Sequence, residues 1–198
     1  MDLRPMRPLL FAACLLPVPA AADEVTDQIQ SALEAYEQQD LQGAISDLNY
    51  AVAQIQEMVN TQNAQLLPEP LEGWTASEVE NAGAAMSMLG GGTNMTRRYQ
   101  HDGESVEINI VANSPWVMSM MQMMGNPMLM ASNPNLKPYR YKRLKGMKDT
   151  SDGRTEVTLS VVGQIMVKVT GQNLADEAVI EQYLDAIDFE KIQTALLQ

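Results

Sequence analysis

Cysteine, histidine and positive charge are all scarce in this chain. Its 198 residues include one cysteine, Cys14, and one histidine, His101, and 25 acidic residues outnumber 13 basic ones. Without cysteine beyond position 14, the remainder of the chain forms no disulfide, thiolate nucleophile or zinc–thiolate site. A formal net charge of −12 argues against nucleic acid as a partner. We therefore expect a protein with no nucleic-acid partner and no resident cofactor.

The scarcity of histidine also bears on catalysis. His101 precedes Asp102-Gly103, a pair typical of a hairpin turn. A serine hydrolase would need this one residue as its proton acceptor, and the chain has no nucleophile-elbow motif. The sequence therefore favours a protein that is not an enzyme, and a hydrolase of unknown type remains an alternative.

Residues 1–22 have the pattern of a secretory signal peptide. Arg4 and Arg7 precede an apolar stretch, and Ala20-Ala21-Ala22 supplies small residues for cleavage. The apolar stretch is about half of the ~20 residues that span a bilayer, so we expect a periplasmic protein without a transmembrane segment. Cys14 weakly resembles a lipoprotein cleavage site, which makes a lipoprotein of the inner or outer membrane the alternative.

Residues 23–66 are predicted to form an acidic helical hairpin. Apolar residues such as Leu33, Ile45 and Leu48 recur at helical spacing, and the helices are expected to join near Gln39. The segment contains eight acidic residues and neither lysine nor arginine. A hairpin of this size buries little by itself, so we expect it to rest on a neighbouring domain.

The small residues of this segment carry a resemblance to a known repeat. Ala32, Ala35, the pair Gly43-Ala44 and Ala51 are spaced as in the helix-turn-helix of a single tetratricopeptide (TPR) repeat, which the segment resembles. The resemblance implies two helices that approach closely. Pro68 and Pro70 then predict an extended linker over residues 67–73.

Residues 74–198 are predicted to form an α+β domain, in which a mainly antiparallel sheet is covered by helices. Alternating apolar residues and turn residues between them indicate the strands, and apolar residues at helical spacing indicate two closing helices. We expect strands at 93–100, 104–112, 137–147, 154–162 and 165–170, and helices at 176–187 and 188–197.

This order of elements is similar to the Mog1/PsbP-like α/β/α sandwich. The resemblance rests on Leu71-Glu72-Gly73-Trp74 at the domain entry, on Ser114-Pro115 after an apolar strand, and on the closing segment from Tyr183 to Phe189. Members of that family are mostly binding or assembly factors, so the resemblance implies a protein that binds rather than catalyses.

A methionine-rich insertion over residues 115–131 is the most specialised part of the chain. Ser114-Pro115 predicts a helix start, and the segment is too apolar to be an ordinary surface helix. Methionine adapts to irregular partners, so we interpret the insertion as a contact for an apolar small ligand or a protein partner, with core packing as the alternative. The predicted contact residues are Trp116, Met118, Met120, Met121, Met123, Met124, Met128 and Met130.

Copper(I) is a second hypothesis for the same segment. Thioethers are soft ligands that suit Cu(I), and several of these methionines are separated by one residue. The copper ligands would be the seven methionines named above, from Met118 to Met130. No other metal site is expected.

Positive charge is concentrated just after the insertion. The basic patch could be a solvated strand, a match for the acidic hairpin, or a site for an anionic partner. Its members are Lys137, Arg140, Lys142, Arg143, Lys145 and Lys148.

These patterns together favour an exported, non-enzymatic binding or assembly factor that presents its methionine-rich segment to an apolar ligand or a protein partner. Peripheral contact with a membrane is compatible with this hypothesis. A periplasmic Cu(I)-binding protein is the first alternative, and the hydrolase is the second.

Processing of the signal peptide gives the first testable prediction. Because the small residues end at Ala22, the exported protein is expected to begin at Asp23 and to carry no lipid. Intact-mass measurement of the exported protein checks this. A diacylglyceryl-modified species that begins at Cys14 would contradict it.

Overall fold

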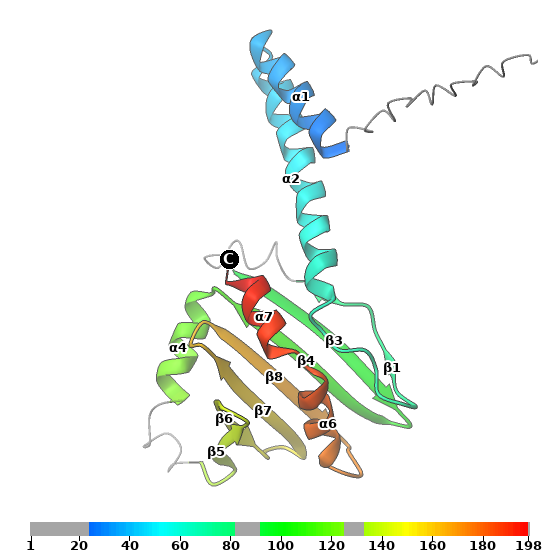
Figure 1. Cartoon of the computed structure of the whole chain (residues 1–198), viewed down its shortest axis with the longest axis vertical. Coiled ribbons are helices and arrows are strands. Elements are labelled where there is room, and N and C mark those ends of the chain that lie inside the picture. Colours follow the sequence, from blue (N-terminus) through cyan, green and yellow to red (C-terminus); the bar gives the residue numbers. More distant parts are fainter. Residues whose placement is uncertain (1–23, 82–91, 125–132, 198) are drawn as a thin grey trace, which may run out of the picture. The chain divides into compact units, whose positions relative to one another are not determined.

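The computed structural model describes residues 24–81, 92–124 and 133–197, and Figure 1 shows the chain. The chain divides into two compact units, the first ending at Gln56 and the second beginning at Glu57. The first unit contains one helix and most of a second, and the second unit contains the end of that second helix, a mainly antiparallel sheet and further helices. The predicted α+β class is thereby confirmed. The predicted signal peptide, Cys14, Met128 and Met130 lie outside the described residues.

Two helices joined by a short turn make up the N-terminal part, as predicted. Helix α1 runs over Glu24–Glu37 and helix α2 over Leu41–Ala64. Gln39 adopts a positive φ of 65° in the turn, and Asp40 caps α2 by accepting a hydrogen bond from the Gly43 amide at 3.0 Å. A Cβ at position 43 would lie 2.4 Å from the Asp40 carboxylate, so glycine leaves room for this cap.

Small side chains line the contact between α1 and α2. Ala32, Ala44 and Ala51 are the buried residues of the pair. Asp47 accepts hydrogen bonds from Gln28 at 2.7 Å and from Ser31 at 2.8 Å. The two helices therefore meet through alanines and polar groups, and their larger apolar side chains are left outside this contact.

An eight-stranded antiparallel sheet forms the centre of the described part of the second unit. Its strand order is β1-β3-β4-β8-β7-β6-β5, and β2 pairs with β3. The strands are β1 (Thr75–Ala76), β2 (Glu80–Asn81), β3 (Thr93–His101), β4 (Glu104–Ala112), β5 (Leu136–Tyr141), β6 (Leu144–Asp149), β7 (Arg154–Val161) and β8 (Ile165–Gln172).

One predicted strand is wrong. The segment 137–147 is not a single strand but parts of β5 and β6, which pair with each other from Leu136 opposite Asp149 to Tyr141 opposite Leu144. The turn between them consists of Lys142 and Arg143, and Lys142 takes the positive φ of 52° that glycine or asparagine usually supplies. The short strands β1 and β2 were also not predicted.

Helices α6 (Ala178–Ala186) and α7 (Phe189–Leu196) cover one face of the sheet. The main core lies between these two helices and the sheet, and it includes Ile108, Val167 and Leu184, which are all completely buried. Helix α4 (Pro115–Met124) packs on the opposite face, over a smaller cluster of Val111, Val117 and Met166. The three helices predicted after the first unit therefore lie close to where the sequence places them.

The segment 67–73, predicted as an extended linker, packs on the sheet. Leu67 is buried in the main core, and the Pro68 carbonyl accepts hydrogen bonds from the Tyr99 hydroxyl at 2.7 Å and from Arg97 at 3.1 Å. Trp74 follows, and its ring contacts the Tyr183 ring edge-on, with the ring centroids 5.6 Å apart. The prolines favour an extended backbone, in which the Pro68 carbonyl faces these two donors.

Candidate functional site

Helix α4 is tied at its start to two other elements. The chain reverses after β4 at Asn113, which has a φ of 55°. The Asn113 amide donates to the Gln164 carbonyl at 3.2 Å, in the turn between β7 and β8. Its side-chain amide donates to the Leu196 carbonyl at the end of α7, at 2.7 Å. These bonds fix where α4 begins.

One side of α4 is anchored on the sheet. Val117 is completely buried against Val111 of β4 and Met166 of β8, and Met120 and Met121 are partly buried against the same cluster. Spacings of three and four residues place these α4 residues on one helix face, as the sequence predicts. We call Met120, Met121 and Met166 the methionine cluster.

Met166 was missed by the sequence analysis. It lies in the consecutive apolar run Ile165-Met166-Val167, and such a run indicates a strand that is buried on both faces. That signal was available. The identity of its contact was not, because it depends on β8 pairing with β4, where Met166 stands opposite Val111.

Two large apolar side chains are exposed at the end of the sheet where α4 begins. Met118 on α4 is 63% exposed, and Val162 in the β7–β8 turn is 55% exposed. Val162 has a φ of 46°, an unusual conformation for a β-branched residue. Because the Asn113–Gln164 bond joins this turn to the start of α4, both side chains lie at the same end of the sheet. We call Met118 and Val162 the α4 surface.

The chain around the α4 surface carries no charge. Between Glu107 and Lys137 the sequence has no aspartate, glutamate, lysine, arginine or histidine. Among the described residues beyond α2, the large apolar side chains that stand exposed are those of the α4 surface. The segment that carries Met118 is therefore neutral and apolar, while Lys145, opposite Ser160 of β7, places positive charge on the same face of the sheet.

The remaining predicted contact residues can be placed only in the chain. Trp116, Met123 and Met124 belong to α4, but their side chains, like residues 125–132, are outside the described part. Among the residues that are described, no group of three or more histidine, cysteine, aspartate or glutamate side chains could hold a metal ion. Nor is any described helix both long and apolar enough to cross a membrane.

The six basic residues do not form one patch. Lys137 pairs with Lys148 across β5 and β6 on the face that carries α6, and Arg140 pairs with Lys145 on the other face. Lys142 and Arg143 form the turn.

Two of these cations are paired with acids of the same unit. Lys148 contacts Glu177 at 2.6 Å, just before α6, and Lys142 contacts Asp185 of α6 at 3.1 Å. Tyr141 also donates a hydrogen bond to Asp185, and together with Lys142 it lowers the pKa of that carboxyl. These contacts join the β5–β6 hairpin to α6.

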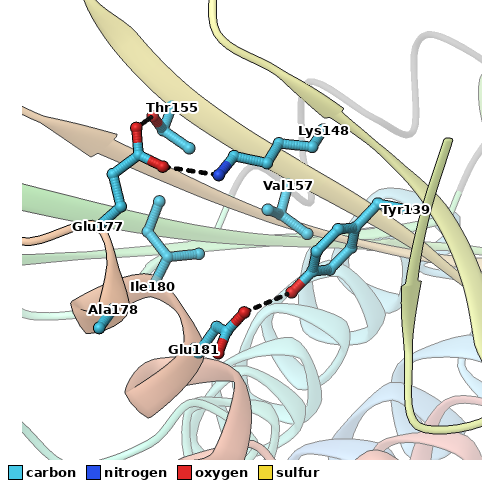
Figure 2. Close-up of a pocket in the computed structure, with 8 residues that line it drawn as sticks. All are labelled: Tyr139, Lys148, Thr155, Val157, Glu177, Ala178, Ile180 and Glu181. Atoms are coloured by element: carbon cyan, nitrogen blue, oxygen red, sulfur yellow. Dashed lines mark hydrogen bonds and ion pairs between the residues drawn. The ribbon is translucent and has the colours of Figure 1, made fainter. Parts of the chain in front are cut away.

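A pocket of about 260 Å³ lies at this joint, and Figure 2 shows its lining side chains. Glu177 accepts hydrogen bonds from Lys148 and from the Thr155 hydroxyl at 2.9 Å, while Tyr139 donates to Glu181 at 3.3 Å. The polar groups of the pocket therefore bind one another across it. This arrangement suits a structural joint better than a site with a free acid or base.

His101 also has a structural environment. Its Nδ1 donates a hydrogen bond to the Gly73 carbonyl at 2.7 Å, because a carbonyl can only accept. Its ring stacks on Trp74 with centroids 5.6 Å apart, and Nε2 lies 3.8 Å from the Asp102 carboxylate. The imidazole thus holds the 67–74 segment against the end of β3.

Comparison with protein-family models, with curated proteins and with solved structures found no match to this chain. Its function is therefore inferred from its own residues, and in the described part of the chain beyond α2 the α4 surface is the apolar feature that packing does not explain.

The joint at Glu177 gives a prediction about acid stability. Hydrogen bonds from Lys148, and to a smaller extent from Thr155, lower the pKa of Glu177 in the folded protein. The ionised Glu177 therefore stabilises the fold fully above its pKa in the unfolded chain, about 4.3, and this stabilisation is lost as the pH falls through the lower pKa of the folded protein. The Glu177→Gln variant lacks this carboxylate, so its free energy of unfolding should fall less on acidification than that of the unmodified chain. Because the Glu177 side chain is 56% exposed, we expect a difference of at most about 1 kcal/mol.

Urea unfolding at pH 6, 4 and 3 measures this difference. Glu190→Gln, on an exposed carboxylate of α7 that lies outside the pocket in Figure 2, is the control and should follow the unmodified chain. A Glu177→Gln variant with an unchanged acid profile would contradict the assigned role.

The two kinds of methionine at α4 should respond differently to truncation. Met166→Ala removes a completely buried side chain and should lower the free energy of unfolding by about 2 to 5 kcal/mol. Met118→Ala alters an exposed side chain and should stay within about 0.5 kcal/mol. Denaturant unfolding of both variants compares them, and equal losses would show that Met118 is also a packing residue.

Proposed function

We propose that this chain is an exported, non-enzymatic binding or assembly factor that uses its methionine-rich segment to contact an apolar ligand or a protein partner. The observation that carries the proposal is the α4 surface. Its two apolar side chains are exposed, Met118 on a helix that is firmly attached to the sheet and Val162 on the β7–β8 turn that is hydrogen-bonded to the start of that helix. A rigid support with an adaptable methionine contact suits binding of apolar groups.

The architecture proposed for the second unit is the Mog1/PsbP-like sandwich. An antiparallel sheet with α6 and α7 on one face and α4 on the other supports this proposal. A single TPR-like hairpin is proposed for the first unit, supported by the alanines buried between its helices. Members of the Mog1/PsbP-like family are mostly binding or assembly factors, in keeping with the proposed function.

Export to the periplasm is part of the same proposal, and its support is the pattern of residues 1–22. The proposal that the protein is not an enzyme is supported by His101. Its Nδ1 is hydrogen-bonded to the Gly73 carbonyl and its ring stacks on Trp74. The carboxylate near Nε2 is that of the adjacent turn residue Asp102.

Binding at the α4 surface can be tested with Nile red as an apolar probe and methyl-¹³C-methionine NMR as the readout. Nile red should shift the methyl resonances of Met118 and of the neighbouring Met120 and Met121. Met58 provides an internal control, since it is 53% exposed and belongs to α2 rather than to α4. Shifts at Met58 alone, or no methionine shifts, would overturn the proposal.

A double variant makes the test quantitative. Met118→Ser with Val162→Ser should weaken probe binding at these methyl groups at least about tenfold, which corresponds to about 1.4 kcal/mol. The melting temperature should change little, because both side chains are exposed. Met58→Ser is the matched control and should leave these shifts unchanged.

A periplasmic Cu(I)-binding function is the second candidate, favoured by the methionine cluster. Met120 and Met121 meet Met166 in one small cluster, which brings thioethers from two separate elements together. Cu(I) titration of the purified chain, followed by sulfur-to-copper absorption, tests it. Met166→Leu should abolish the signal and Met118→Ser should retain it, whereas no signal in the unmodified chain would exclude this function.

A further inference from the structure

The helical hairpin carries an apolar stripe that its own packing does not use. On α2 the stripe consists of Leu41, Ile45, Leu48, Val52 and Ile55, at alternating spacings of four and three residues. On α1 it consists of Ile29, Leu33 and Tyr36, again at spacings of four and three. All eight residues are 42 to 59% exposed. We call these eight residues the hairpin stripe.

Both halves of the stripe lie on the same side of the hairpin. Successive helical residues are rotated by about 100°, so the stripe lies about 40 to 120° around each helix from its buried alanines. Hydrogen bonds of Gln28 with Asp47 and of Glu24 with Tyr50 show that the helices are antiparallel. In antiparallel helices an equal rotation from the shared contact leads to the same side, so the two halves form one surface.

Most of the negative charge that the hairpin carries lies away from this surface. Asp27 and Glu34 lie on the opposite side of α1 by the same rotation, and Asp47 points into the contact between α1 and α2. The described hairpin has no lysine or arginine that could rim the stripe and form ion pairs with an acidic partner. A partner with a similar uncharged stripe fits it better than a charged one.

The spacing of the stripe indicates what covers it. Alternation of three and four residues is the 3.5-residue repeat by which helices pack against helices, with knobs of one helix in holes of the other. A short two-helix hairpin is not stable without further burial, and here only Ala32, Ala44 and Ala51 are buried between the helices. The occupant should therefore supply helices with the same repeat.

The stripe can supply the apolar centre of a dimer interface. A standard interface takes about 800 Å² and roughly 20 to 30 residues from each partner, with an apolar centre and a polar rim. Eight large apolar side chains at about half exposure supply such a centre, and the polar residues beside them supply the rim. A two-fold axis would place the stripe against itself, as symmetric dimers require.

We propose that the hairpin stripe is the interface with a second copy of this chain. Two hairpins pack stripe to stripe and form a four-helix bundle, in which the apolar residues lie at the centre and the carboxylates remain in solvent. This interface is separate from the α4 surface and does not depend on the function proposed for it.

Light scattering after size exclusion of the full processed chain tests the proposal. The unmodified chain should elute with twice the mass of one copy at about 50 µM. Leu48→Glu with Val52→Glu places charge in the stripe and should yield one copy at the same concentration. Ser46→Glu with Ala53→Glu adds the same two charges on the side of α2 that faces away from the stripe and should remain a dimer.

Hydrogen exchange of the unmodified chain gives a second readout that does not depend on the folding of variants. Amide protection over residues 41–56 should increase as the concentration is raised, because dimerisation covers the stripe. A monomer with a concentration-independent, protected stripe would overturn the proposal and assign the stripe to a contact within the chain. A dimer that persists in the Leu48→Glu, Val52→Glu variant would overturn it as well.

Discussion

The pairing of β4 with β8 is the constraint on which the second unit depends. These strands are far apart in the chain and pair over their whole lengths, from Ser105 opposite Gln172 to Ala112 opposite Ile165. Because side chains alternate between faces, this one ladder sets two cores at once. Ile108 meets Val169 in the main core, while Val111 meets Met166 beneath α4. A slip of one residue would exchange these faces.

The position of α4 follows from this register. The chain leaves β4 directly into Asn113, whose two hydrogen bonds reach the β7–β8 turn and the end of α7. Val117 then meets the small cluster that the register has placed on that face. The α4 surface is therefore supported by the centre of the sheet and not by a free loop.

Much of the fold could be predicted from periodicity, because the strands alternate and the helices repeat every three or four residues. Val106, Ile108 and Ile110 locate β4, and Asp102-Gly103 marks the turn before it. The β5–β6 turn could not be predicted in the same way. It uses Lys142 at a positive φ, and nothing in its composition distinguishes it from a continuing strand.

That missed turn explains why the basic residues looked like one patch. Six cations within twelve positions are close in the chain, but a reversal at Lys142 distributes them over two faces and a turn. Two of them then meet carboxylates beside or on α6, whose positions depend on tertiary packing. Local sequence carries the charge of a segment, whereas the topology decides which charges share a surface.

The methionines illustrate the same limit. The helix face of Met120 and Met121 follows from their spacing, but Met166 joins them only through the pairing of β8 with β4. Sequence alone therefore could not decide which methionines are anchored and which are exposed. Met118 was already among the predicted contact residues, but it could be distinguished from the anchored methionines only when the buried face of α4 was known.

The two apolar surfaces of this chain differ in a way that suits different partners. The hairpin stripe is built mainly of branched Ile, Leu and Val, which have few rotamers and favour one fixed packing arrangement. The α4 surface centres on methionine, whose unbranched side chain adapts to varied shapes. A fixed surface serves permanent association, and an adaptable one serves exchange of ligands or partners. If both proposals hold, each dimer carries two α4 surfaces, so a partner with two apolar segments binds the second with the advantage of a high effective concentration.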